Sequence, residues 1–153
     1  MSRATVGPTG GFRAVMTTHR QTIRIYLEDT DAQGVVYHAN YLKYCERSRT
    51  DILREAGYSL ANLQAQGWTL MVHELNIKFH GPARLHDEVI VETTAERSSG
   101  FRLVFHHAVR LEGAPRPLVT ADAHVVAVGP DGGLVPLPDG LMTQTAVSRT
   151  SSG

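Results

Sequence analysis

The chain has 153 residues, of which 15 are basic and 15 acidic, and 42% of all residues are hydrophobic. A chain of this length suits one domain with one sizeable core. Balanced charge gives no overall attraction to nucleic acid or to an acidic membrane surface, so we expect no nucleic-acid partner. No apolar run approaches the ~20 residues of a membrane span, so we expect none.

Cysteine usage and the N-terminal segment bear on the compartment. Cys45 is the only cysteine, which excludes a disulfide within the chain. A single cysteine fits a reducing compartment. The N-terminal segment lacks the apolar region of a signal peptide. We therefore expect a cytoplasmic protein.

The two ends of the chain show little hydrophobic periodicity. Residues 1–18 are rich in glycine, and residues 139–153 finish in Ser-Arg-Thr-Ser-Ser-Gly. Segments of this kind bury too little apolar surface to become ordered. We predict flexible tails over 1–18 and 139–153, and a folded domain over 19–138.

The folded part is predicted to begin with a strand and a long helix. Apolar and polar residues alternate over 22–27, which is typical of a half-buried strand. A polar stretch over 28–34 follows. Helical spacing then predicts a helix over 40–56, which Gly57 is suited to end. Its expected buried stripe consists of Tyr41, Cys45, Ser48, Ile52 and Ala56, with Leu42 and Leu53 beside it. A second, short helix is predicted over 60–66.

The remaining chain is predicted to form strands joined by turns. Alternating patterns occur over 71–79, 89–92, 101–111 and 117–128, and residues typical of turns separate them. In the first of these runs, Met71, His73 and Leu75 are expected to share a face. Consecutive strands with short connections favour an antiparallel sheet, and one amphipathic helix can cover one of its faces. The predicted class is α+β.

One motif is specific enough to indicate a family. The segment Asp-Thr-Asp-Ala-Gln-Gly-Val-Val-Tyr-His-Ala-Asn-Tyr runs from Asp29 to Tyr41, and Cys-Glu-Arg-Ser-Arg follows from Cys45. It resembles the active-site segment of the 4-hydroxybenzoyl-CoA thioesterase family, and is most similar to the Tol–Pal-associated acyl-CoA thioesterase branch. The resemblance covers residues 21–129. It implies the hot-dog fold, in which an antiparallel sheet wraps around one long central helix, with acyl-CoA as substrate and assembly into homodimers or homotetramers.

By position in the motif, the family's catalytic carboxylate falls on Asp31, and its oxyanion donor falls on the backbone N–H of His38. The chemistry is reasonable in its own right, because a thiolate with a reference pKa of ~8.5 leaves readily and needs little help. One carboxylate, together with the N–H groups and dipole at a helix start, can then suffice. We expect Gly34, Val36 and Tyr37 to contact the substrate.

Other carboxylates must be weighed against Asp31. An aspartate in a turn before a helix is often a cap or a turn former, and we assign that role to Asp29. Glu46 is the rival catalytic group, since another branch of the fold places a glutamate on the central helix. We expect Glu46 instead to pair with Arg49 or Arg47.

The same residues bear on metals, cofactors and alternative functions. We expect no metal, because His-Glu-x-x-His is absent and His106 and His107 should point to opposite faces of a strand. We expect no cofactor, since coenzyme A is part of the substrate. Two alternative functions stay open: a hot-dog acyl-CoA hydratase or dehydratase, and a non-catalytic acyl-CoA-binding protein. The candidates for contact with the phosphates of coenzyme A are Lys78, Arg84, Arg97 and Arg102.

Overall fold

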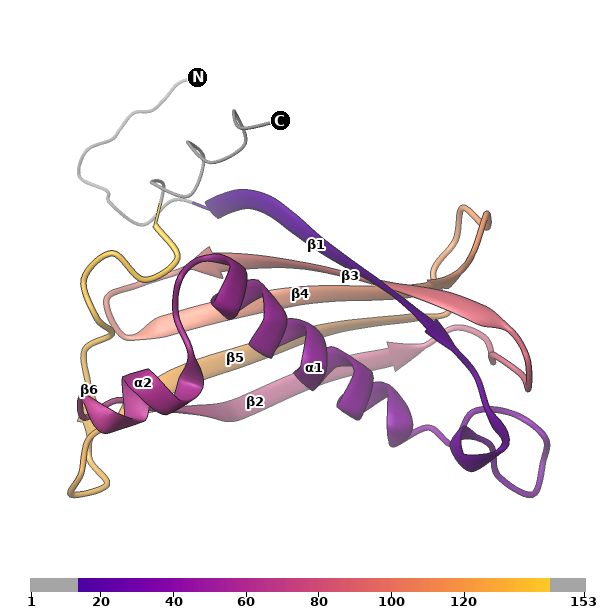
Figure 1. Cartoon of the computed structure of the whole chain (residues 1–153), viewed down its shortest axis with the longest axis horizontal. Helices are drawn as coiled ribbons and strands as arrows, with labels where there is room; N and C mark the ends of the chain where they lie inside the picture. The colour runs from indigo at the N-terminus through magenta and orange to yellow at the C-terminus, as the bar shows by residue number, and fades with distance from the viewer. Residues whose placement is uncertain (1–13, 144–153) are drawn as a thin grey trace.

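A single antiparallel sheet and one long helix make up the fold, as the computed structural model shows (Figure 1). The structure describes residues 14–143. The strands are β1 (Ala14–Arg24), β2 (Thr69–Phe79), β3 (Glu88–Arg97), β4 (Arg102–Leu111), β5 (Val119–Val128) and β6 (Leu134–Val135). Their order in the sheet is β1-β3-β4-β5-β2, and β6 pairs with β5. The helices are α1 (Asn40–Glu55), α2 (Leu60–Ala65) and a short 3-10 turn, η2 (Leu27–Asp29).

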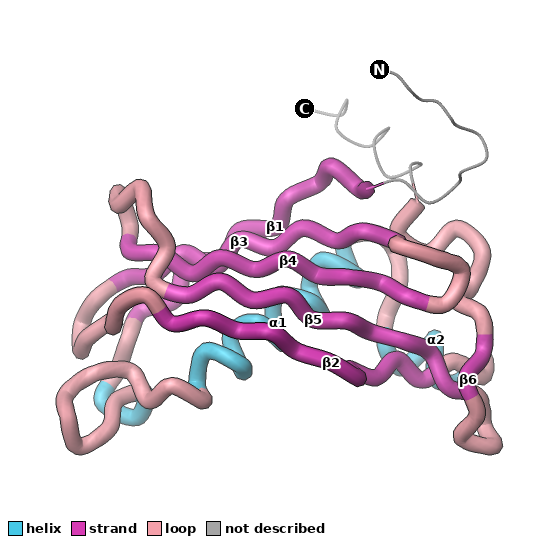
Figure 2. Tube along the Cα trace, turned by 180° about the vertical axis from the view of Figure 1, so that it is seen from behind, coloured by secondary structure: helices cyan, strands magenta, loops and turns pink. Residues whose placement is uncertain are grey.

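Helix α1 lies along one face of the sheet (Figure 1). From behind, the strands stand in front of both α helices, so the opposite face carries no helix within the described residues (Figure 2). The helix packs its buried stripe against strands that contribute mainly valine, alanine, leucine and phenylalanine to the core. One apolar face on the helix and one on the sheet are what this two-layer arrangement requires.

The long helix was predicted within one residue of its end. Of the predicted stripe, Tyr41, Cys45, Ser48 and Ile52 are buried, as is Leu53 beside it. Leu42 is 38% exposed, and Tyr44 takes a core position that the prediction did not give it. The predicted α+β architecture is confirmed.

A bulge in β2 changes the predicted faces of that strand. Val72 pairs with Val125 and Leu75 with Ala123, so the register shifts between Val72 and Glu74. Leu75 therefore faces the core, whereas Met71 pairs with Val126 on the other face. The expectation that Met71 shares a face with Leu75 was wrong, because one extra residue reverses the alternation.

The predicted folded domain, residues 19–138, was too short at both ends. Strand β1 begins at Ala14, so residues 14–18 belong to the sheet and not to a tail. At the other end, Leu141 is fully buried and Met142 is 2% exposed within the core. The rest of the predicted tails, residues 1–13 and 144–153, lies outside the described residues.

Candidate active site

The segment between β1 and α1 is held against the turn that precedes β3. The backbone N–H of Val36 donates to the carbonyl of Ala83 at 2.9 Å, and Val35 forms a bridge with Arg84. A second bridge, Thr30 with Val36, closes the loop on itself. Gly34 sits at its tip with φ +81°, a conformation that strains residues with a Cβ. The loop is therefore fixed at the start of the helix.

Asp29 is occupied by structural hydrogen bonds. Its Oδ1 accepts from the Tyr44 hydroxyl at 2.8 Å, and its Oδ2 accepts from the Tyr26 backbone N–H at 2.9 Å. Its carbonyl accepts from the Asn40 side chain at 2.8 Å. Burial and this carboxylate together raise the pKa of Tyr44, which keeps the hydroxyl as a donor. These contacts agree with the assignment of Asp29 to the turn.

Asp31 is more open than Asp29. Its Oδ1 accepts from the backbone N–H of Gln33 at 2.8 Å, which is a local turn contact. Within residues 14–143, its Oδ2 accepts no hydrogen bond and the carboxylate has no cationic partner. The side chain is half-buried. Asp31 therefore keeps a carboxylate oxygen that can act on a substrate or a water molecule.

The start of α1 carries unused backbone donors. Ala39, at the N-cap position, has φ −70° and offers no side-chain cap. The N–H groups of Asn40 and Tyr41 donate to the carbonyls of Tyr37 and His38. Among the described residues, the N–H groups of His38 and Ala39 find no acceptor. Uncapped donors at the positive end of a helix dipole are suited to a developing oxyanion.

A hollow of about 300 Å³ adjoins this helix start. Its lining includes Val36 and His38, two of the residues predicted for the site, together with Tyr41, Phe79, His80, Gly81 and Pro82. Tyr37 is 47% exposed, with its ring centroid 4.7 Å from that of His38. Gly34 is not part of the lining. No sequence pattern indicated Phe79 and His80 for this site, because only the fold brings the end of β2 beside the start of α1.

Comparison with known proteins identifies the family to which this chain belongs. Residues 25–145 match the family model described as the thioesterase-like superfamily. The chain belongs to this superfamily. It is 38% identical over 115 residues to the Escherichia coli acyl-CoA thioester hydrolase YbgC, an alignment that covers 74% of this chain and 84% of that protein.

Solved structures of thioesterases show the same hot-dog fold. The 1,4-dihydroxy-2-naphthoyl-CoA thioesterase from Synechocystis superposes with a TM-score of 0.77 at 27% identity, covering 87% of this chain and 97% of that one. A probable thioesterase from Bartonella henselae gives a TM-score of 0.72 at 32% identity, covering 80% of this chain and all of that one. The family and fold expected from the sequence are confirmed.

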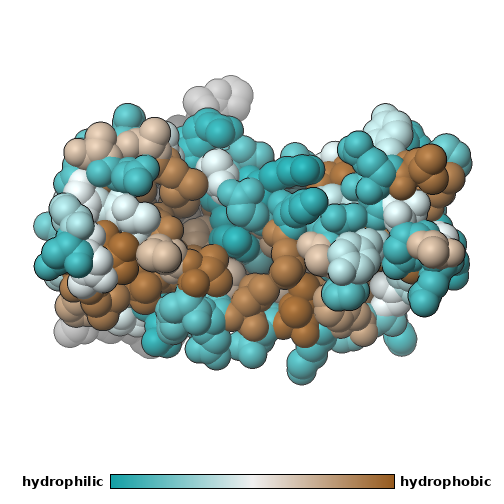
Figure 3. Space-filling model, turned by 90° about the horizontal axis from the view of Figure 1, so that it is seen from below, coloured by the Kyte–Doolittle hydropathy of each residue, from teal (hydrophilic) through white to brown (hydrophobic). Residues whose placement is uncertain are grey.

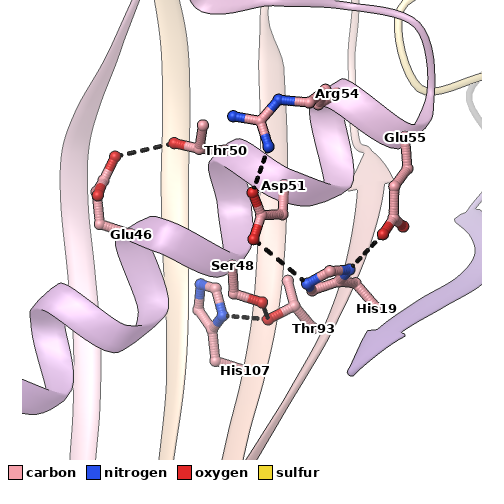
Figure 4. Close-up of polar contacts among 9 residues, drawn as sticks. All are labelled: His19, Glu46, Ser48, Thr50, Asp51, Arg54, Glu55, Thr93 and His107. Carbon is pink, nitrogen blue, oxygen red and sulfur yellow. Dashed lines mark hydrogen bonds and ion pairs between the residues drawn. The ribbon is translucent and has the colours of Figure 1, made fainter. Parts of the chain in front are cut away.

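In this thioesterase-family chain, the rival carboxylate Glu46 is turned along its own helix. Its Oε2 accepts from the Thr50 hydroxyl at 2.9 Å (Figure 4). No arginine lies within ion-pair distance of Glu46 in the described part of the chain, so the expected direct pairing with Arg49 or Arg47 is not found. The charge of Glu46 still raises the pKa of Arg49. The hydroxyl four residues on offers Glu46 a local partner, whereas Arg49 is directed inward to His107.

A row of polar side chains is buried between the middle of α1 and the sheet. Ser48 Oγ lies 2.6 Å from Thr93 Oγ1, which lies 2.7 Å from His107 Nδ1 (Figure 4). Arg49 Nη1 donates to His107 Nε2 at 3.2 Å. Burial, and then the charge of Arg49, lower the pKa of His107 to about 3, so this histidine is neutral. The prediction that His107 and His106 face opposite ways is confirmed, since His106 is exposed.

One candidate for the coenzyme A phosphates has a structural role instead. Arg97 is 5% exposed and donates to the carbonyls of Pro138 at 2.7 Å and Leu141 at 3.2 Å. It thereby holds the last described segment against the sheet and is not placed to meet a phosphate. The other three candidates, Lys78, Arg84 and Arg102, are exposed.

Proposed function

We propose that this chain hydrolyses an acyl-CoA thioester to a free acid and coenzyme A. Asp31 acts as the nucleophile or the general base, and the N–H groups at the start of α1 form the oxyanion site. The match to the thioesterase-like superfamily supports the reaction class. The acyl-CoA substrate is supported by the names of its relatives, among them the acyl-CoA thioester hydrolase of Escherichia coli.

The observation that carries the proposal is the set of unpaired polar groups at the start of α1. The N–H groups of His38 and Ala39 can receive the carbonyl oxygen of the thioester. Asp31 can then attack the carbonyl carbon, or take a proton from a water molecule that attacks it. The carbon–sulfur bond breaks and the thiolate of coenzyme A leaves. If Asp31 attacks, water must afterwards hydrolyse the mixed anhydride.

Release of free thiol tests the function. Purified protein is offered short-chain, long-chain and aromatic acyl-CoAs, and thiol is followed with a chromogenic reagent. We expect thiol release from at least one of them. Conversion of an unsaturated acyl-CoA without thiol release would indicate a hydratase. Binding of acyl-CoA with no conversion would indicate a binding protein, and either result would contradict the proposal.

We also propose that the protein is a homodimer or a homotetramer. Strand β2 is an edge of the sheet, and an edge strand presents unpaired backbone groups to another chain. Met71 is 50% exposed, Val72 45% and Phe79 48% along this strand. Figure 3, seen from this side, shows apolar side chains gathered on the surface. Light scattering should give a multiple of the monomer mass, and a fully active monomer would contradict the proposal.

Two smaller proposals concern the compartment and cofactors. A cytoplasmic location is supported by the single, buried Cys45, which suits a reducing environment. Cell fractionation checks it. We further propose that catalysis uses no metal or cofactor, because one carboxylate and the helix start supply the required chemistry. Thiol release should therefore be unchanged by dialysis against a chelator, and a loss of activity restored by metal would contradict this.

A further inference from the structure

A groove follows the seam between α1 and β2. Two hollows, of about 360 and about 120 Å³, lie along it and share Glu46, Arg49 and Val72. The smaller hollow is otherwise lined mainly by apolar side chains, among them Leu53, Leu70, Phe105 and Val125. A groove with an apolar lining and a few polar groups is the usual form of a site for a small acyl chain.

Arg49 is a cation of this groove that makes no direct ion pair within the described residues. Its side chain is half-buried, and the one hydrogen bond it makes within residues 14–143 runs from Nη1 to a neutral histidine. None of the described carboxylates lies within ion-pair distance of its guanidinium. Burial lowers its pKa, but a guanidinium stays charged in proteins. The charge of Glu46 opposes this shift from a distance. A half-buried guanidinium without a direct ion pair is costly, so a ligand carboxylate that bonds to it directly is favoured.

The buried polar row fixes the orientation of Arg49. Since arginine can only donate, His107 Nε2 must accept, and His107 Nδ1–H must donate to Thr93 Oγ1. The Thr93 hydroxyl then donates to Ser48 Oγ. This chain of donors keeps His107 in one tautomer and holds one arm of the guanidinium. The other guanidinium donors, which have no partner among the described residues, remain for a ligand.

The groove begins near the reacting end of the helix. Arg49 is ten residues after Ala39, and a rise of ~1.5 Å per residue places it about 15 Å further along the helix axis. Long helical side chains extend back toward the helix N-terminus, which shortens this distance. An acyl chain whose carbonyl lies at the N–H groups of His38 and Ala39 can therefore follow the apolar seam toward the guanidinium.

We propose that Arg49 selects acyl chains that end in a carboxylate, so that the preferred substrates are mono-CoA thioesters of dicarboxylic acids. The proposal rests on the function proposed above. A guanidinium binds a carboxylate through two parallel hydrogen bonds, which distinguishes it from a methyl terminus. Lys43 and Arg49 outweigh Glu46 among the charges that line the two hollows. Glu46 is also engaged with Thr50.

The test compares chains of equal length that differ only at the far end. The ratio of kcat/KM for adipyl-CoA to that for hexanoyl-CoA is measured by thiol release, and the suberyl and octanoyl pair extends the series. For the wild-type chain we expect a ratio of about ten or more for at least one pair, because a hydrogen bond to a charged group is worth that much. In Arg49→Gln the ratio should fall to about one.

Arg47→Gln is the matched control, since it removes the same charge from an exposed position on the same helix. It should keep the wild-type ratio, and Arg49→Lys should keep part of it. A wild-type ratio near one for both pairs would overturn the proposal, and this holds even if Arg49→Gln fails to fold. An unchanged ratio in folded Arg49→Gln would also overturn it. Absence of thiol release from all four substrates, with release from a long-chain or aromatic acyl-CoA, would overturn this proposal alone, whereas absence of release from every acyl-CoA would refute the proposed function.

Discussion

The start of α1 and its middle differ in whether their polar groups have hydrogen-bond partners. In the middle, Ser48, Thr93 and His107 are buried and bonded to one another. At the first turn, the N–H groups of His38 and Ala39 have no acceptor within the described residues. The cluster in the middle is buried and must satisfy its own polar groups, whereas His38 is exposed and Ala39 half-buried, so their N–H groups are accessible to a ligand.

The same contrast is repeated between two aspartates of one turn. Both carboxylate oxygens of Asp29 accept hydrogen bonds, from Tyr44 and Tyr26, whereas Asp31 keeps one oxygen open within residues 14–143. The family motif separates the two by resemblance, whereas residue type does not. Their partners in the fold agree with that division, because they give Asp29 a structural role and leave Asp31 open for chemistry.

The largest expected effect on turnover comes from a substitution of Asp31. Asp31→Asn should lower turnover by at least ~10²-fold, since it removes the charge and basicity of the carboxylate. The amide keeps an acceptor oxygen for Gln33 and caps turns about as well, so the melting temperature should change little. Thiol release and thermal unfolding measure the two effects.

Glu46→Gln is the matched control for Asp31→Asn, because it changes a carboxylate whose one hydrogen bond within the described residues is to Thr50. It should keep most of the activity toward an uncharged acyl-CoA. Near-normal turnover in Asp31→Asn, or a loss of turnover confined to Glu46→Gln, would contradict the assignment of catalysis to Asp31.

A smaller effect, on stability, is expected from disrupting the buried hydrogen bonds among Ser48, Thr93 and His107. Thr93→Val leaves Ser48 and His107 without their shared partner in a buried position. We expect a loss of about 1–3 kcal/mol in the free energy of unfolding. Hexanoyl-CoA turnover well below the melting temperature should stay within a few-fold. Denaturant unfolding measures the first, and a large loss of turnover without destabilisation would contradict the structural assignment.

His107 should make the protein less stable in acid. The unfolded chain protonates this histidine below a pH of about 6.5, whereas the folded chain resists protonation until about pH 3. Its contribution is therefore full above pH 6.5 and lost as the pH falls toward 3, by about 2 kcal/mol already at pH 5. Unfolding of His107→Gln should depend less steeply on pH in this window, and an equal slope would contradict a neutral buried histidine.

The neighbouring His106 should act in the opposite direction and more weakly. Burial lowers the pKa of His106. Hydrogen bonds to Glu96 at 2.9 Å and Asp122 at 2.7 Å outweigh burial, so the net pKa is raised. Its contribution is therefore full below a pH of about 6.5 and lost as the pH rises through the folded pKa. Because these groups are largely exposed, we expect less than about 1 kcal/mol. Unfolding of His106→Gln at pH 6 and pH 8 checks the sign.

Periodicity alone predicted the elements of the fold well. The spacing over 40–56 located α1, and alternation located β2 to β5, because both patterns are local. The first strand was predicted over 22–27 but runs over Ala14–Arg24, and Leu27 lies in the 3-10 turn that follows. The β2 bulge and the burial of Leu141 and Met142 were missed, since neither leaves a local pattern. The contact between Arg49 and His107 joins residues far apart in the sequence, and no spacing rule links them.

The candidate site depended on a different kind of information. Asp31 and His38 were located by resemblance to a family motif, because an aspartate in a turn is ambiguous by itself. What the sequence could not show is that Asp29 is fully bonded and that the helix start is uncapped. Phe79 and His80 reach the same hollow from another strand, which only the fold reveals.

A crystal structure of Asp31→Asn with an intact acyl-CoA would show whether the thioester binds at the start of α1. We expect the thioester oxygen to accept hydrogen bonds from the N–H groups of His38 and Ala39, at about 3 Å. The substituted side chain should then face the carbonyl carbon. A thioester bound beside Glu46, with the first turn of α1 unoccupied, would contradict it.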